Sequence, residues 1–271
     1  DEVFVLRLTA DHAGSLSFDV GLDRPERATV AAVGASDLIM EGALADGRGG
    51  DNVRFAARVR VVSRGGTQEV AGALLQVRGA DEVIIFLSAA TDIGNRSFAG
   101  RKVRNAGEAA KIDLAAAAEK EFEQLKASHV ADYQKWYRRA SLELGATSAD
   151  SPSTPERVKA FAAGNADPGL AALYFNFGRY LLISSSRPGG LPANLQGIWA
   201  DSINTPWNGD WHLNINVQMN YWLAEVANLP ELHQPLFALI ESLTGPGAKT
   251  AKSYYNARGW VAHVITNPWG F

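Results

Sequence analysis

The sequence contains no cysteine, which excludes disulfide bonds, thiolate metal sites and cysteine nucleophiles. It leaves the compartment open, because an exported bacterial enzyme can also lack cysteine. Histidine is scarce, and none of the five forms an i,i+4 ligand pair. No phosphate-cradling glycine loop of the P-loop type is present. We therefore expect neither a metal site nor a cofactor.

Long hydrophobic runs and an excess of positive charge are also missing. No run of about 18 apolar residues occurs, so no membrane-spanning segment is expected. The net charge of −3 gives no sign of a nucleic-acid-binding face. With 46% hydrophobic and 20% charged residues, the 271-residue chain is expected to be globular, with one or two domains. It begins inside a strand-like pattern without a start methionine, and both of its ends look cut.

Tryptophan and tyrosine are absent from the first 132 residues. All seven of each lie from Tyr133 onward, and six of the seven tryptophans fall between Trp199 and Trp269. Asparagine is crowded over the same region, with seven residues between Asn194 and Asn228. The two halves of the chain are therefore expected to have different functions.

The first half alternates between apolar and polar residues. Val3–Leu8, Ser15–Val20 and Val53–Val61 show the period of two that half-buried strands have. Arg64-Gly65-Gly66 before Thr67 is a hairpin signal, and Val83–Leu87 is an apolar run typical of a central strand. This pattern predicts an antiparallel β-sandwich over residues 1–100.

The second part is helical in composition. We expect helices between Asn105 and Leu144, then from Ser153, from Asp167 to Leu182, over Leu213–Asn228, and over His233–Asn256. Pro230 would separate the last two helices. Long helices with short connections after a sandwich predict an α-helical toroid or bundle. The expected domains are a partial sandwich (1–100), a helical linker region (101–164) and a helical domain (165–271).

The connection from Leu191 to Asn216 is long, punctuated by glycine and proline, and carries Trp199, Trp207 and Trp211. Long aromatic loops in compact domains are usually functional. An indole stacks on the C–H face of a sugar ring, and the neighbouring amide and carboxylate groups can bind hydroxyls. Alternatively, the three tryptophans stiffen the loop or fill a helical core.

Asn214 and Asn216 form an Asn-x-Asn pair at the start of an expected helix. In an extended segment both amides would face one target, whereas in a regular helix they would point about 200° apart. Joint action therefore requires a non-helical first turn. The alternative is that the asparagines cap the helix.

The sequence gives little support for the catalytic groups of common hydrolases, such as a carboxylate pair or a serine nucleophile. Only five acids lie between Gln196 and Phe271, and nothing pairs the two loop acids Asp201 and Asp210 convincingly. No Gly-x-Ser-x-Gly motif is present. Asp210 could bind a sugar hydroxyl or cap the following helix, and His263 is a candidate pocket residue near the end of the chain.

Several long motifs nevertheless resemble one family, the α-L-fucosidases of glycoside hydrolase family 95, and they occur in the family's order. They are Gly178–Gly189, Leu191–Trp199, Leu213–Trp222 and Gly259–His263. The resemblance implies that residues 1–100 are the later part of an N-terminal β-sandwich. It also implies linker helices, followed by the opening of an (α/α)6 barrel.

The activity implied by the resemblance is inverting hydrolysis of terminal α-L-fucosides. Asn214 and Asn216 would hold the nucleophilic water through their amide oxygens, helped by a distant aspartate. His212 falls where the family's fucosidases contact the sugar, which favours L-fucose over L-galactose. The family's general-acid glutamate and the assisting aspartate would lie further downstream. The chain alone is therefore expected to be inactive.

Two other functions stay open. One is a glycoside phosphorylase, which would need a basic phosphate pocket. The loop from Gln196 to Asn216 has no lysine or arginine, and only Arg179 and Arg187 upstream could supply one. The other is a non-catalytic carbohydrate-binding protein. The expected partner is a fucosylated oligosaccharide or polysaccharide, and the oligomeric state is not indicated. A periplasmic or secreted location is expected, since fucosides occur on secreted glycans and plant wall polymers.

Overall fold

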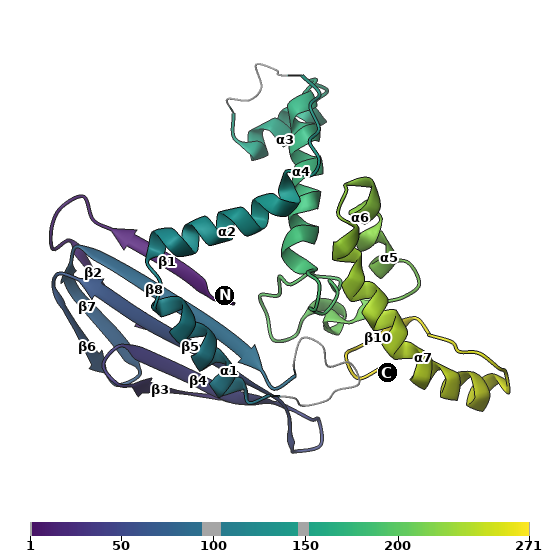
Figure 1. Ribbon diagram of the computed structural model, residues 1–271, viewed down its shortest axis with the longest axis horizontal. Helices are drawn as coiled ribbons and strands as arrows, with labels where there is room; N and C mark the ends of the chain where they lie inside the picture. The colour runs from purple at the N-terminus through teal and green to yellow at the C-terminus, as the bar shows by residue number, and fades with distance from the viewer. Residues whose placement is uncertain (1, 94–103, 146–151, 271) are drawn as a thin grey trace. The chain divides into compact units, whose positions relative to one another are not determined.

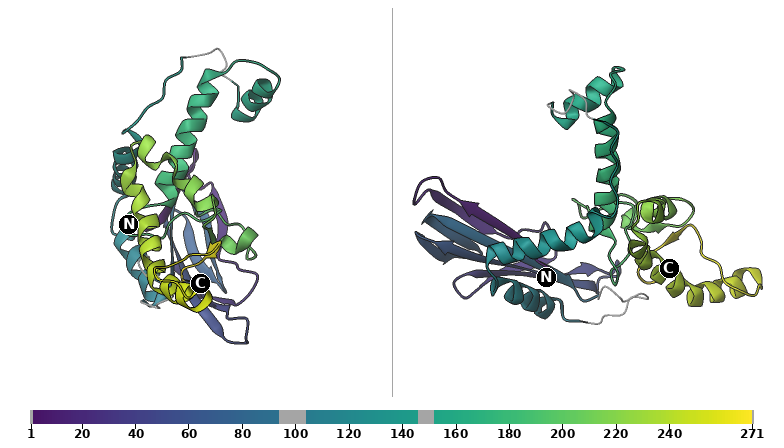
Figure 2. Two further views of the ribbon diagram at one scale, coloured as in Figure 1. Left: turned by 90° about the vertical axis from the view of Figure 1, so that its right-hand side faces the viewer. Right: turned by 45° about the horizontal axis from the view of Figure 1, so that its top comes forward.

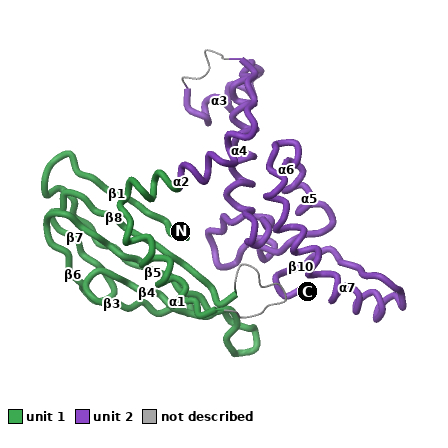
Figure 3. Tube along the Cα trace, viewed as in Figure 1, with its two compact units in different colours: residues 1–97, 101–128 green, residues 98–100, 129–271 purple. Residues whose placement is uncertain are grey.

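A computed structural model of the chain describes residues 2–93, 104–145 and 152–270. The chain divides into two compact units, residues 1–97 with 101–128, and residues 98–100 with 129–271 (Figures 1 and 3). The division falls inside helix α2 (Phe122–Tyr137). The expected domain boundary at 100/101 lies outside the described residues, and all three expected domains stay predictions.

Unit 1 contains two antiparallel sheets. The five-stranded sheet has the order β1-β8-β5-β4-β3, and the three-stranded sheet has the order β2-β7-β6. The strands are β1 (Phe4–Thr9), β2 (Leu16–Gly21), β3 (Ala28–Val33), β4 (Asp37–Ala45), β5 (Asp51–Arg64), β6 (Thr67–Ala71), β7 (Leu74–Ala80) and β8 (Glu82–Thr91).

The core of this sandwich lies between the two sheets. Leu38 of β4 and Val59 and Val61 of β5 pack with Leu75 and Val77 of β7, and each is at most 4% exposed. Burying one such side chain contributes about 1.5–3 kcal/mol to the free energy of folding. The predicted antiparallel β-sandwich is therefore confirmed.

Helix α1 (Ala106–Ala118) covers the other face of the five-stranded sheet. Its N-cap is Asn105, whose side chain accepts a 2.9 Å hydrogen bond from the Glu108 amide. Leu114 and Ala117 pack against Phe86 of β8. Because β8 has the sandwich core on one side and α1 on the other, its apolar residues run almost continuously, as predicted for a central strand.

The hairpin predicted at Arg64-Gly65-Gly66 is wrong. Gly65 and Gly66 do form a tight turn with φ of 73° and 65°. However, β5 pairs with β4 and β8, whereas β6 pairs with β7 of the other sheet. The glycine turn therefore carries the chain from one sheet to the other, and a turn signal alone does not tell which strands pair.

Unit 2 is mainly helical, and Figure 2 shows α3 packed against the first turns of the long helix α4. The elements are α3 (Thr154–Ala162), α4 (Pro168–Ser185), η2 (Pro206–Gly209), β9 (Trp211–His212), α5 (Asn216–Tyr221), α6 (Leu223–Val226), η3 (Pro230–His233), α7 (Gln234–Tyr255) and β10 (Ile265–Thr266).

The predicted helix starts near Ser153 and Asp167 are confirmed. Ser153 and Glu156 form a capping box at α3, and the Asp167 carboxylate accepts from the Leu170 amide at α4. Arg157 of α3 also donates to both oxygens of Asp167 at 2.9 Å. The two helices are thus joined at one buried carboxylate.

The single helix predicted over Leu213–Asn228 is wrong, because the segment forms two short helices, α5 and α6, separated at Trp222. The segment ends at Asn228, which takes a left-handed φ of 57°, just before the break predicted at Pro230. Helix α7, by contrast, covers nearly the whole predicted range His233–Asn256.

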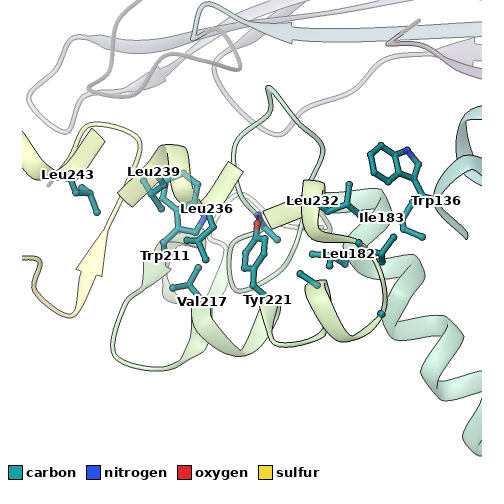
Figure 4. Close-up of a cluster of buried hydrophobic side chains, with 14 residues drawn as sticks. Trp136, Leu182, Ile183, Trp211, Val217, Tyr221, Leu232, Leu236, Leu239 and Leu243 are labelled. Carbon is teal, nitrogen blue, oxygen red and sulfur yellow. Dashed lines mark hydrogen bonds between the residues drawn. The ribbon is translucent and has the colours of Figure 1, made fainter. Parts of the chain in front are cut away.

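The core of unit 2 connects these elements (Figure 4). Leu182 and Ile183 of α4 belong to the same buried cluster as Tyr221 of α5 and Leu236 and Leu239 of α7. This core fixes the long connection between α4 and α5, which carries most of the predicted site residues.

Candidate active site

The connection from Ser186 to Ile215 is held by a buried polar network. The Tyr221 hydroxyl accepts a 2.8 Å hydrogen bond from the Ala193 amide and shares another of 2.8 Å with the Ser186 hydroxyl. Ser186 also bonds the Leu232 carbonyl at 2.8 Å. Burial raises the pKa of the Tyr221 phenol, opposed by its bonds to Ser186 and Ala193. The phenol therefore stays neutral and ties the loop to α5.

Three amide side chains fold the loop further. Asn194 accepts from the Gln196 amide at 2.8 Å, and the Asn220 side chain donates to the Asn194 carbonyl at 3.0 Å. Gln196 in turn donates to the Pro206 carbonyl at 3.1 Å. These asparagines and the glutamine act as structural supports, which leaves other amides of the segment for a ligand.

Asn214 and Asn216 are such amides. Asn214 is exposed and Asn216 half-buried, and neither side chain makes a hydrogen bond within the described parts of the chain. The N-cap of α5 is Ile215, with φ −161° and ψ −33°, and no side chain caps the helix. The capping alternative is therefore not observed. Ile215, between the two asparagines, thus has a non-helical backbone, and Asn216 is the first residue of α5.

The backbone of Leu213, just before this pair, is hydrogen-bonded through both its amide and its carbonyl. The Leu213 amide donates to the Val264 carbonyl at 2.7 Å, and the Leu213 carbonyl accepts from the Gln218 side chain at 2.6 Å. Just upstream, β9 pairs antiparallel with β10, so that His212 lies opposite Ile265. The pair thus starts from a rigid backbone, as a site that positions a ligand needs.

His212 carries an unused polar atom. Its Nε2 is buried and has no hydrogen-bond partner in the described structure. The ring of Trp207 meets the imidazole edge-on, with centroids 5.6 Å apart. A buried nitrogen without a partner is costly, and such groups in native proteins often await a ligand or water.

Asp210 lies between these two aromatic residues in the sequence and is half-buried. Burial raises the pKa of its carboxyl group, whereas a hydrogen bond from Asn208 and the nearby His212 lower it. Asp210 directly precedes β9 rather than a helix, so the capping alternative does not apply. Its position leaves it as a candidate hydroxyl ligand.

The three loop tryptophans are placed differently. Trp199 is 44% exposed and Trp207 is 71% exposed, so both rings can meet a ligand. Trp211 is 4% exposed, belongs to the core of unit 2, and donates through Nε1 to the Pro192 carbonyl at 3.0 Å (Figure 4). The loop-stiffening alternative therefore describes Trp211 best, because its ring fixes the strand that carries His212.

His263 lies on the segment after α7. Its Nε2 is 2.9 Å from the Tyr255 hydroxyl, and its ring meets the rings of Tyr254 and Tyr255 edge-on. The residue is exposed. Hence it is available to a ligand, although no contact joins it to Asn214 or Asn216 in the described structure.

Comparison with known proteins identifies the family to which the chain belongs. A model of the glycosyl hydrolase family 95 catalytic domain matches residues 121–271, and a model of the glycosyl hydrolase family 65 N-terminal domain matches residues 1–96. The chain belongs to glycoside hydrolase family 95. The helices of unit 2 are accordingly the start of that family's helical barrel, as the sequence predicted.

Named relatives agree with this family. "Alpha-L-fucosidase 2" of Arabidopsis thaliana is 36% identical over 99% of the chain, and "Probable alpha-fucosidase A" of Aspergillus niger is 44% identical over 57% of it. A protein of the same name from Aspergillus oryzae is 37% identical over 72%. The family 95 chain spans 35% of the length of the plant relative and 20% and 28% of the fungal ones.

Two glutamates of the family 95 segment are bonded to basic side chains. Glu225 is bonded to His233 at 2.7 Å, and Glu231 is paired with Arg139 at 2.6 Å. These bonds lower the pKa of both glutamates. Across the described ranges, no group of three or more histidines and acids could hold a metal ion, and no helix could cross a membrane.

Sequence reasoning missed two parts of this site. One is the Ser186–Tyr221 pair, for which the only signal was a tyrosine inside the Leu213–Trp222 motif. The other is the ribbon of β9 and β10, because two-residue strands give no periodic pattern. Both fix the backbone around the predicted residues rather than adding a new functional group.

Proposed function

We propose that this chain is the water-holding part of an inverting α-L-fucosidase that acts on fucosylated oligosaccharides or polysaccharides. The observation that carries the proposal is the pair Asn214 and Asn216, whose amides stay unbonded while neighbouring asparagines serve as supports. The names of the three relatives agree with fucose as the sugar.

The role of the two amides is to position a water molecule. A neutral amide cannot remove a proton at pH 7, but its oxygen accepts a hydrogen bond and so orients a water. A carboxylate further along the network then raises the basicity of that water. Inversion follows when this water attacks the face of the sugar opposite the leaving group.

The remaining predicted residues would bind the sugar. In this proposal the buried Nε2 of His212 meets a hydroxyl, and Asp210 and His263 bind further hydroxyls. The exposed rings of Trp199 and Trp207 cover the apolar face of the sugar. Trp211 holds β9 in place from the core.

We infer that the 271-residue chain does not hydrolyse a fucoside by itself. Glu231 is paired with Arg139 and Glu225 is hydrogen-bonded to His233, and nothing in the described structure pairs Asp210 with a second carboxylate. An inverting reaction needs both a general acid and a group that activates the water. Turnover therefore requires a longer protein that carries this sequence.

The phosphorylase alternative is weakened by the two arginines on which it depends. Arg179 is fully buried and donates to the carbonyls of Trp136, Tyr137 and Ala140 at 2.7–3.2 Å. Arg187 donates to the Ile183 carbonyl and pairs with Asp132, both at 2.7 Å. Neither guanidinium group is available to hold a phosphate.

The test uses the full-length gene product that carries this sequence, with 2′-fucosyllactose as substrate. We expect release of fucose without phosphate, initially as the β-anomer by NMR, and loss of most turnover in Asn214→Ala and Asn216→Ala. Asn204→Ala, an exposed loop amide, is the matched control and should keep wild-type rates. Wild-type rates in either test variant would sink the assignment.

The other outcomes identify the alternatives. Release that depends on added phosphate would indicate a phosphorylase, and binding without any release would indicate a carbohydrate-binding protein. The predicted periplasmic or secreted location stays a proposal, and fractionation of cells that express the full-length gene would test it.

A further inference from the structure

A cavity lies between α7 and the segment that follows it. Its volume is about 370 Å³, and its lining includes Leu213, Tyr254, His263, Ile265 and Thr266. Leu213 stands between His212 and Asn214 in the sequence, and Ile265 is paired with His212 across the β9–β10 ribbon. The cavity is therefore adjacent to His212 and Asn214 through Leu213 and Ile265, and His263, which the proposed function assigns to the sugar, lines it directly.

The sequence builds this cavity with a Gly-Pro-Gly segment inside α7, Gly245 to Gly247. At Gly247 a β-carbon would lie 2.6 Å from the Val261 carbonyl oxygen, and the Val261 amide donates to the Gly247 carbonyl at 3.2 Å. The segment after α7 can thus approach the helix closely at Gly247. Beyond it the chain runs through His263 to β10, and the cavity lies between this segment and the helix.

Thr266 is the clearest sign that the cavity is built for a ligand. The residue is 1% exposed and lines the cavity, and its Oγ1 has no hydrogen-bond partner among the residues that the structure describes. A buried hydroxyl without a partner costs free energy that a valine of the same shape would not cost. A ligand hydroxyl that reaches this atom would satisfy it.

The rest of the lining indicates which ligand fits. It holds no lysine, arginine, aspartate or glutamate, and it combines aliphatic side chains with the ring of Tyr254. Tyr254 is 78% exposed, so one face of the ring is free for stacking. An aromatic face together with a hydroxyl and an imidazole suits a neutral pyranose, whose C–H face is apolar and whose edge is polar.

We propose that this cavity binds the neutral sugar to which the fucose is attached, with the Thr266 hydroxyl bonded to one of its hydroxyl groups. The inference rests on the proposed function, because it places the cavity next to the fucose site. The enzyme would then recognise the leaving sugar as well as the fucose. An acidic leaving sugar would bind poorly, because no lysine or arginine is among the described residues that line the cavity.

The test compares two substrates in the full-length gene product. 2′-Fucosyllactose has a neutral leaving sugar, whereas α-L-fucosyl fluoride has none. Thr266→Val is expected to raise KM for fucosyllactose by about tenfold, the effect of one hydrogen bond of roughly 1.4 kcal/mol. It should leave kcat/KM for the fluoride unchanged and should not lower the unfolding temperature, while Thr266→Ser should restore KM.

Thr244→Val is the matched control and should leave KM unchanged, since Thr244 also lies on α7, is not among the residues that line the cavity, and donates its hydroxyl to the Glu241 carbonyl at 2.8 Å. Equal losses on both substrates, or no change in KM for fucosyllactose, would overturn the proposal. If the wild type releases fucose from neither substrate, the proposed function has failed instead. The two failures are therefore separable.

Discussion

The indole ring of Trp207 meets the imidazole ring of His212 edge to face, with their planes at 81°. This contact is made from an unusual backbone. Trp207 has φ 56° and ψ 28°, and Asn208 and Gly209 follow with φ of 57° and 61°. A left-handed conformation costs an L-residue roughly 1–2 kcal/mol, so the turn stores strain next to a buried nitrogen without a partner.

The strain at Trp207 can be measured with two truncations. Trp207→Gly and Trp207→Ala both remove the ring, but only glycine adopts a positive φ freely. We expect the glycine variant to be more stable than the alanine variant by about 1 kcal/mol in urea unfolding. Equal stabilities would contradict the left-handed turn. Under the proposed function both variants of the full-length protein should also lose affinity for fucosides, because each removes the ring that would cover the apolar face of the sugar.

Tyr221→Phe tests the network that holds the loop. Removing the hydroxyl leaves the Ala193 amide and the Ser186 hydroxyl without that partner inside the core. We expect a loss of about 1–3 kcal/mol in the free energy of unfolding. Tyr174→Phe is the control, since Tyr174 is 79% exposed. A comparable loss in both variants would refute the network as the cause.

Two helical glycines should respond to alanine with opposite signs. At Gly247 of α7 the added β-carbon would lie 2.6 Å from the Val261 carbonyl oxygen, whereas at Gly178, inside α4, it would meet nothing within 4 Å. Gly247→Ala should destabilise by about 1–3 kcal/mol. Gly178→Ala should stabilise by about 0.5–1 kcal/mol, because alanine favours the helix. Thermal unfolding of the two variants distinguishes these signs, and a shared sign would refute the close approach.

Asp210 makes stability depend on pH. Burial holds its pKa above the ordinary value of 3.8, so the folded state favours the protonated form. The stability from this group is therefore complete below the ordinary value and is lost as the pH rises through the folded-state pKa. Asp210→Asn should gain stability relative to wild type at pH 7 and lose that gain near pH 4.

Urea unfolding at the two pH values measures this difference. Asp201→Asn, a change at an exposed loop acid, is the matched control and should show no such dependence. A gain for Asp210→Asn that is the same at both pH values would instead indicate a packing effect.

Patterns local in the sequence predicted the fold well. Alternation over Val53–Val61 and the apolar run Val83–Leu87 placed two neighbouring strands of the larger sheet, and the capping signals at Ser153 and Asp167 placed two helix starts. The glycine turn at Gly65 misled, because both of its flanking strands pair elsewhere. Pairing is decided by long-range packing, which a turn motif does not contain.

The candidate site was predicted less completely. The Asn-x-Asn pair within the Leu213–Trp222 motif singled out Asn214 and Asn216 as candidates, and the structure shows that neither caps the helix. For Trp211 the sequence allowed both a core and a surface position, because a tryptophan suits either. Thr266 gave no signal at all, since its importance comes from a missing hydrogen bond, which only coordinates reveal.

The bond from the Ala193 amide to the Tyr221 phenol has a consequence for the lifetime of the loop. Ala193 lies in a segment without regular secondary structure, yet its N–H is enclosed in the core of unit 2. Its proton can exchange with deuterium only when that core opens. At Ala193 the loop that carries the proposed site residues therefore opens only together with the helices around it, and slow exchange at this one amide would report on both.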